Sequence, residues 1–373
     1  MLFLKYGATD KCHGLKVMET FSNQRVIGNG RGNSDCLNLI RLLAAFQVLY
    51  GHTLAHMNID SIPILGEFIN FFSGVPIFFT MSGFLIWGSI GRSKNFGEYL
   101  KKRFWRIFPE LWGAVAIELI VLLCLYHEPI NWLQFGAFAI TQSTIFQFWT
   151  PECLRGYGCG CPNGALWTIC VLIQFYFFAF LVYKALHGRK TGVWLIAFVA
   201  SLGLSLMLPF IREYLPEIAR KLLGQTLLPY FWMFLAASFV AEKKDVVLPF
   251  LKKYWWVFLA ALLLVRISGF DFMAGYNVLS TILLFLCLTG AAYVFPKLNV
   301  KTDISYGVYI YHMTVVNALI ALGYTGNQWL LLLVTAITSI LAWISTKTIG
   351  KLSMRMKGKS QDSKRQRVED LGF

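Results

Sequence analysis

Ten apolar stretches, each near the length that a helix needs to cross a bilayer, recur along the whole chain. They cover residues 37–57, 68–90, 104–126, 165–186, 192–210, 226–241, 254–270, 276–295, 304–322 and 328–348. Barrel strands would be about half as long and would alternate apolar with polar residues, which these stretches do not. Inside lipid the backbone must then be satisfied within helices. The sequence predicts an all-α, polytopic transmembrane bundle of about ten helices.

The composition argues against a soluble protein. Only 14% of the 373 residues are charged and 57% are hydrophobic, with a mean hydropathy of +0.57. Soluble domains carry about 25% charged residues. The net charge of +15 would suggest a nucleic-acid partner in a soluble chain. Here the position of the charges has to be considered first.

Lysine and arginine gather in alternate loops between the apolar stretches. One set of loops and ends holds 28 of them and the opposite set holds 4, with Arg41 and Arg266 left inside stretches. The positive-inside rule then places both termini in the cytoplasm. The surplus is therefore topological, and no nucleic-acid partner is expected. The basic inner face would attract anionic lipid headgroups and phosphate-bearing substrates.

The chain divides into three parts. Residues 1–34 are predicted to be a disordered cytoplasmic extension, residues 35–349 a membrane domain with an outer loop at 127–164, and residues 350–373 a basic cytoplasmic tail. Three glutamines interrupt the apolar run at 130–148, which we interpret as a re-entrant or interfacial element and not as an eleventh span.

Three cysteines lie close together in the predicted outer loop. An oxidising compartment would permit one disulfide there, from Cys153 to Cys159 or Cys161. Unpaired thiols and metal ligands are the alternatives. The eight cysteines of the chain do not have the spacing of a zinc site, and we expect no metal.

Two ionisable residues share one face of the first span. Arg41 and His52 are 11 residues apart, which at about 100° per residue is three turns plus about 20°. They are separated by about 16 Å along the axis, so Arg41 lies near the inner leaflet and His52 in the outer half. An ionisable side chain at mid-membrane costs about 2.5–3.5 kcal/mol and therefore needs a cavity or a partner. The alternatives are a snorkelling arginine and a histidine satisfied by a carbonyl.

The third span adds two more arginines and a carboxylate. Arg103 and Arg106, at i and i+3, could present two guanidinium groups to one polyanion at the membrane surface, or could serve only as positive-inside anchors. Glu118 lies deeper in the same span. We expect it to be buried, with a partner that the sequence leaves open: Arg41, Arg266 or His52.

Other polar or small residues mark the second, fourth and ninth spans. The glycines and proline of residues 72–84 favour close helix approach. Trp167 and Tyr176 lie in the fourth span, and Tyr311 and His312 in the ninth. His312 fits a cavity residue and a structural hydrogen bond equally well.

Several of these segments recur together in one family. Arg41 and His52 match a first-helix Arg with a His 11 positions later. Residues 74–85 match Gly-Val-x-x-Phe-Phe-x-x-Ser-Gly-Phe-Leu, and residues 103–109 match Arg-x-x-Arg-x-x-Pro. In order and over about residues 33–343, the chain resembles the acyltransferase-3 family of integral membrane O-acyltransferases, which acetylate bacterial surface polysaccharides.

Two positions depart from that family's pattern. Members usually carry an acidic residue shortly after the Trp-Thr of the fourth span, where this chain has Leu172 followed by Ile173. An Asp common three residues before the first-helix Arg is Asn38. Glu118 could replace the missing acid, or the acid could be dispensable, or the activity could be altered.

The resemblance implies an acyl-CoA donor, usually acetyl-CoA, and a glycan hydroxyl acceptor at the bacterial inner membrane. We assign Arg103 and Arg106 to the CoA phosphates and Arg41 to the donor's phosphate or thioester end. His52 would deprotonate the sugar hydroxyl or transiently carry the acyl group. Candidate groups around the reacting atoms follow: Ser82 and Tyr311 as donors to the oxyanion, Glu118 as a catalytic acid, and Trp167, Tyr176 and His312 as cavity residues.

Two other classes of protein fit parts of the pattern. A transporter or flippase could line a path with the same Arg and His, although no inverted repeat is apparent. A receptor or scaffold without catalysis would fit the leucine at position 172. No permanently bound cofactor is expected, and the oligomeric state is left open.

Overall fold

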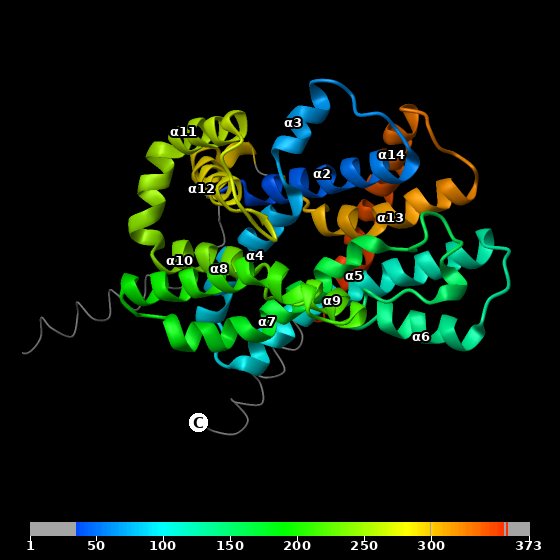
Figure 1. The fold of residues 1–373 in the computed structure, drawn as a ribbon, viewed down its shortest axis with the longest axis horizontal. Coiled ribbons are helices and arrows are strands. Elements are labelled where there is room, and N and C mark those ends of the chain that lie inside the picture. The colour runs from blue at the N-terminus through cyan, green and yellow to red at the C-terminus, as the bar shows by residue number, and fades with distance from the viewer. Residues whose placement is uncertain (1–34, 299, 354–355, 357–373) are drawn as a thin grey trace, which may run out of the picture.

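A computed structural model describes residues 35–298, 300–353 and 356 of the chain (Figure 1). The predicted extension at 1–34 and most of the predicted tail at 350–373 lie outside the described residues. The long helices are α2 (Leu37–Met57), α4 (Gly74–Gly91), α5 (Phe96–Leu125), α7 (Trp167–Leu186), α8 (Thr191–Glu213), α10 (Phe231–Glu242), α11 (Lys244–Ser268), α12 (Val278–Val294), α13 (Ser305–Ala321) and α14 (Trp329–Ser345). Shorter elements are α3 (Leu65–Phe71), α6 (Trp132–Gln142), α9 (Glu217–Gly224), the 3₁₀ turns η1 (Glu152–Leu154), η2 (Gly164–Leu166) and η3 (Pro296–Leu298), and the π-turn η4 (Thr346–Gly350).

The helical class is confirmed. The described part contains only two strands, β1 (Met273–Ala274) and β2 (Tyr276–Asn277), which form one antiparallel pair. A helix lies in each predicted apolar stretch, and α2 coincides with residues 37–57. Among the described residues, six helical stretches are long and apolar enough to cross a membrane: Leu65–Gly91, Phe96–Leu125, Gly164–Leu186, Thr191–Glu213, Lys244–Ser268 and Trp329–Ser353.

The helix ends differ from the predicted ones where polar residues continue a helix. Helix α5 begins at Phe96, where the Asn95 side chain accepts a hydrogen bond from Glu98 N at 2.9 Å and caps the helix. Helix α11 begins at Lys244 and bends at Tyr254, which has φ −116° and ψ 15°. At 11 residues α6 is about 16 Å long, too short to cross the hydrocarbon core.

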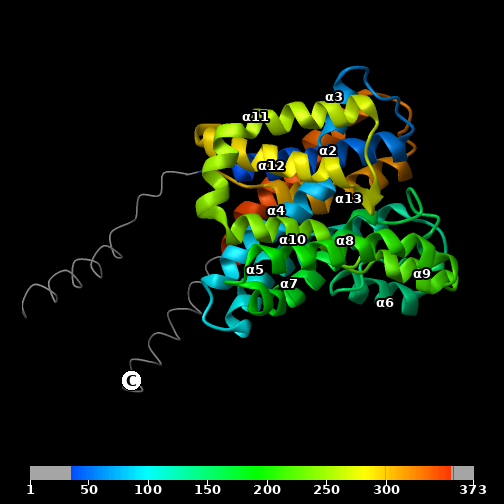
Figure 2. The same cartoon turned by 60° about the vertical axis from the view of Figure 1, so that its left-hand side comes forward.

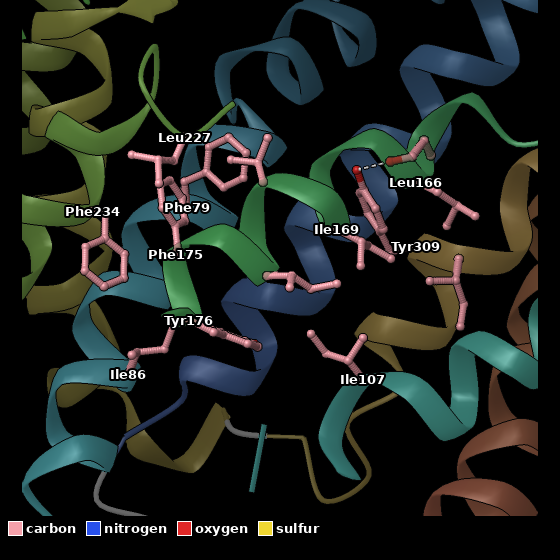
Figure 3. Packing of buried hydrophobic residues seen from close by; sticks show 14 of the residues in the cluster. Phe79, Ile86, Ile107, Leu166, Ile169, Phe175, Tyr176, Leu227, Phe234 and Tyr309 are labelled. Atoms are coloured by element: carbon pink, nitrogen blue, oxygen red, sulfur yellow. Dashed lines mark hydrogen bonds between the residues drawn. The ribbon is translucent and has the colours of Figure 1, made fainter. Parts of the chain in front are cut away.

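The helices pack into one body with its largest apolar cluster at the centre (Figures 1 and 2). Helix α13 packs against α2, α14 and α5, helix α10 against α4, and α11 against α12. Gly83 touches the carbonyl of Phe234 so closely that an added Cβ would collide with it, as the small residues of this segment predict. Figure 3 shows the central cluster, to which α4, α5, α7, α10 and α13 all contribute.

The described structure does not contain the disulfide that the sequence permits. Cys153, Cys159 and Cys161 are all free thiols. The loop is held by other contacts, because the Asn317 side chain accepts from Cys159 N at 2.7 Å and donates to Cys161 O at 3.0 Å. The Cys161 thiol meets Thr150 Oγ1 at 3.3 Å, so its partner is a hydroxyl and not a second sulfur.

Candidate active site

A cavity lies between α2, α4, α5, α7 and α13. Most of its wall is apolar or aromatic, and three arginines lie on it. The lining residues are Arg41, Val75, Phe78, Phe79, Met81, Ser82, Leu85, Ile86, Arg103, Arg106, Ile107, Thr168, Ile169, Leu172, Tyr176, Ser305, Tyr306 and Tyr309. Figure 3 labels six of them on the helices that surround this space: Phe79, Ile86, Ile107, Ile169, Tyr176 and Tyr309.

Two of the arginines share one carboxylate. Arg41 and Arg106 both form ion pairs with Asp303 Oδ2, the second at 3.0 Å. Burial opposes ionisation of Asp303, but Arg41, Arg106 and the Ser305 hydroxyl outweigh it and hold its pKa below the usual value. Arg41 also contacts Asn38 Oδ1 at 3.5 Å. The Asn38 amide, at the position where the family commonly has an Asp, therefore still contacts the guanidinium one turn away.

Arg103 has neutral partners. Its Nη2 donates to Ser89 Oγ at 2.5 Å, and its guanidinium carbon lies 5.8 and 5.7 Å from the ring centres of Tyr99 and Tyr176. Its buried Nε has no hydrogen-bond partner among the described residues. Part of the hydrogen-bonding capacity of this guanidinium is therefore available to an anion.

The two histidines of the predicted site meet side by side. His52 Nδ1 lies 2.9 Å from His312 Nε2, and the rings stack with centres 5.1 Å apart. His312 is fully buried, and its Nδ1 lies 2.7 Å from the carbonyl oxygen of Tyr309. The exposed ring of His56 stands edge-on to His52 at 5.7 Å.

The shared face of Arg41 and His52 is turned toward α13. Arg41 meets Asp303 just before α13 begins, and His52 meets His312 within it. His52 does not line the cavity. Tyr309 lies between the two: it lines the cavity, its ring centre is 5.9 Å from that of His312, and it packs edge-on against Phe78 at 5.2 Å.

Hydrogen bonds hold the Tyr309 side chain in place. Its hydroxyl lies 2.6 Å from Thr168 Oγ1 and donates to Ala165 O at 3.0 Å, the bond drawn as a dashed line in Figure 3. The cavity and the imidazole pair are thus separated by one aromatic side chain.

The remaining predicted residues divide between the cavity and the core. Ser82 and Tyr176 line the cavity. Trp167 does not, and packs against Phe79 and Tyr230 with ring centres 6.4 and 5.6 Å away. Tyr311 is also outside the cavity wall and is 1% exposed, so its hydroxyl does not face the cavity.

Glu118 contacts neither the arginines of the cavity nor the imidazole pair. It is 1% exposed, and its Oε2 accepts from Asn163 Nδ2 at 3.4 Å, so its partner is none of the three that the sequence left open. Arg266 instead contacts Ser73 Oγ at 3.5 Å. Leu172 lines the cavity and Glu118 does not, so Glu118 does not replace an acid at that position.

Asp303 and Tyr309 were not among the predicted site residues. Asp303 lies in the loop immediately before the ninth apolar stretch, where polarity alone does not separate it from ordinary loop residues. Tyr309 belongs to a run of three tyrosines at 306, 309 and 311, and only the packing of α13 against α7 and α4 shows which one faces His312 and the cavity.

The chain was compared with known proteins. A sequence model of the acyltransferase-3 family, described as "Acyltransferase domain", matches residues 34–347. The chain is 29% identical over 351 residues to "Nodulation protein 10" of Rhizobium leguminosarum bv. viciae, with 87% of this chain and 95% of that protein covered. It is 25% identical over 326 residues to the "O-acetyl transferase" of Shigella phage Sf6, with 83% and 94% covered. No solved structure matches significantly.

The family model covers the cavity, the arginines and the imidazole pair, and it also covers all of the long helices. The protein therefore belongs to the acyltransferase-3 family.

Proposed function

We propose that this protein is a membrane O-acyltransferase that moves an acyl group, in the first instance acetyl, from cytosolic acyl-CoA to a hydroxyl of a cell-surface glycan or of its lipid-linked precursor. Family membership and the phage relative named O-acetyl transferase support an acyltransferase. In this proposal the helices form a multi-pass bundle in the bacterial inner membrane, and both termini face the cytoplasm, as the distribution of lysine and arginine predicts.

The observation that carries the proposal is the cavity with Arg41, Arg103 and Arg106 on an otherwise apolar wall. Guanidinium groups form charge-assisted, often bidentate hydrogen bonds with phosphate. The apolar remainder suits an uncharged pantetheine arm and its thioester. A CoA thioester presents this same combination of a polyanionic head and a neutral chain.

The chemistry requires a base near the thioester. The acceptor hydroxyl oxygen attacks the thioester carbonyl carbon, the C–S bond breaks, and His52 takes the hydroxyl proton and returns one to the departing thiolate. Alternatively an imidazole nitrogen of His52 attacks the carbonyl carbon, and the C–S bond breaks to release the CoA thiolate. The hydroxyl oxygen then displaces His52 from the acyl carbon, and the hydroxyl proton goes to the thiolate. In both routes the thioester must pass Tyr309, because that side chain separates the cavity from the histidines.

Purified full-length protein in lipid nanodiscs, supplied with radiolabelled acetyl-CoA and a panel of free and lipid-linked glycans, tests the proposal. We expect His52→Ala and Arg41→Ala to lower label transfer by about 100-fold or more. The matched controls His127→Ala and Arg155→Ala change exposed residues of the outer loop and should transfer normally.

Melting curves and size-exclusion profiles must show that the variants are folded. Full transfer by folded His52→Ala and Arg41→Ala would refute the assignment of the site. Movement of a labelled substrate across vesicles without transfer to any glycan would favour the flippase class instead.

A further inference from the structure

The hydrogen bonds of the imidazole pair, His52 and His312, determine which ring nitrogens carry a hydrogen. His312 Nδ1 lies 2.7 Å from the carbonyl oxygen of Tyr309 and 3.3 Å from that of Val308. Both are backbone carbonyls, which can only accept. His312 Nδ1 must therefore carry a hydrogen.

The second nitrogen of His312 then has a determined role. In neutral imidazole one nitrogen donates and the other accepts. With Nδ1 protonated, Nε2 of neutral His312 is an acceptor, and it lies 2.9 Å from His52 Nδ1. His52 Nδ1 must donate to it. The unprotonated nitrogen of neutral His52 is consequently Nε2, on the opposite edge of the ring.

We propose that His312 is a positioning residue that holds His52 in the Nδ1–H tautomer, so that its Nε2 lone pair is directed to the reacting groups. This inference rests on the proposed function, in which His52 is the base or acyl carrier. Nδ1 of His312 donates to a backbone carbonyl of α13, and Nε2 of His312 accepts from Nδ1 of His52, which fixes the position of the His52 proton.

Burial explains why an imidazole serves here and a carboxylate does not. In the Ser-His-Asp arrangement an aspartate orients the histidine. An isolated carboxylate inside the membrane domain would be costly. His312 is 0% exposed and makes the same kind of contact while neutral. The other ionisable group that faces His52 is His56, on its own helix. From α13 the facing residue is His312, whose ring in turn meets that of Tyr309.

Two substitutions separate the two bonds of His312. In His312→Asn the amide occupies the place of Nδ1, so it can still donate to Tyr309 O but does not reach His52. In His312→Gln the longer side chain places an amide oxygen near the position of Nε2, where it can accept from His52 Nδ1. His127→Asn, in the outer loop, is the matched control for loss of a histidine.

We expect His312→Asn to lower kcat by about 10–100-fold with the KM for acetyl-CoA changed by less than about threefold, because base catalysis is worth about 10²–10⁴ and a misplaced tautomer removes part of it. His312→Gln should keep kcat within about fivefold. The double variant His52→Ala/His312→Asn should be no slower than His52→Ala alone, since the two residues act as one unit.

A measurement on the unmutated protein does not depend on activity or on the folding of a variant. In ¹⁵N-histidine NMR of the protein in nanodiscs at neutral pH, His52 should show a protonated Nδ1 and an unprotonated Nε2, with the signals assigned by their loss in His52→Ala. A protonated Nε2 on neutral His52 would overturn the proposal.

The outcomes distinguish this inference from the proposed function. If His52→Ala is inactive but folded His312→Asn retains the wild-type kcat, the positioning role of His312 is excluded while the acyltransferase site stands. If His52→Ala itself transfers normally, the proposed site fails, and the NMR experiment alone decides the tautomer.

Discussion

Asp303 is the residue on which two of the cavity's arginines converge. Its carboxylate is 14% exposed, whereas the Arg106 side chain is 48% exposed and can also reach solvent. Two guanidinium groups held by one carboxylate leave the cluster with an excess of positive charge. A phosphate that enters the cavity therefore meets a net positive charge. It competes with the Asp303 carboxylate for the two guanidinium groups.

Replacement of this carboxylate should have two effects of opposite sign. Asp303→Asn should lower the free energy of unfolding by about 1–3 kcal/mol, because the Arg41 side chain, which is only 18% exposed, loses its charged partner. Free CoA should raise the melting temperature of the variant more than that of the wild type, since no carboxylate competes for the arginines.

The control is Glu152→Gln, which removes an 89% exposed carboxylate that pairs with Arg155 in the outer loop. It should change neither the stability nor the response to CoA. Equal stabilisation of wild type and Asp303→Asn by CoA would show that the arginines of this cluster do not hold the phosphates.

The ion pairs of Asp303 should also appear in the pH dependence of stability. The folded pKa of this carboxyl lies below its unfolded value of about 3.9, so the stabilisation is present above about pH 4 and is lost as the pH falls through the folded pKa. The difference in melting temperature between wild type and Asp303→Asn should be constant from pH 7 to about pH 5 and should shrink below about pH 4. A difference that disappears near neutrality would contradict this account.

At the level of elements, α13 holds the outer loop through Asn317. This side chain is fully buried and binds Cys159 N at 2.7 Å, Cys161 O at 3.0 Å and Pro162 O at 2.8 Å. Gly158, at φ +58°, lies so close to Asn317 that a Cβ there would overlap its amide. The loop is therefore fastened to α13 through its backbone groups.

Loss of this amide should loosen the loop. Asn317→Ala leaves one backbone N–H and two carbonyls without their partner, which favours local opening by about 1–2 kcal/mol, a factor of about 5–30. Maleimide labelling of Cys159 and Cys161, followed by mass spectrometry, should accelerate by about that factor. Asn327→Ala, which removes an exposed hydrogen bond to Trp329 N, is the control and should label at the wild-type rate.

The sequence predicted which residues share a face of one helix better than it predicted which helices contact each other. The 11-residue interval placed Arg41 and His52 on one face of α2, and both do turn to α13. Apolar length located the helices, but it missed the polar starts of α5 and α11, because capping and bending do not depend on hydropathy. Packing over the whole chain decides which helix faces Arg41 and His52. Asp303, the partner of Arg41, and Asn163, the partner of Glu118, both lie in loops, so no periodic pattern pointed to them.

At the level of the whole molecule, the topology can be tested with single cysteines. In a protein whose native cysteines are replaced by alanine, cysteine at Asp60 or Glu128 should react with a membrane-impermeant maleimide in intact cells, because both positions are exposed in loops assigned to the outer face. Cysteine at Lys94 or Lys190, in loops assigned to the inner face, should react only after the membrane is permeabilised.

Labelling of the Lys94 position in intact cells would place this loop on the outer face. It would then contradict the proposed entry of the donor from the cytoplasm. Labelling of all four positions only after permeabilisation would show that the loops at 60 and 128 are not on the outer face.

Helices α2 and α13 run in the same direction and are joined at two points, by Arg41 with Asp303 just before α13 begins and by His52 with His312 in the middle of α13. Neither helix can slide or rotate against the other without disturbing both attachments. When a ligand withdraws Arg41 from its carboxylate, the register of the two helices rests on the His52–His312 contact and on the apolar packing between them. A donor that binds Arg41, as proposed, would in this way be coupled to the position of His52, three turns of helix away and without any domain movement.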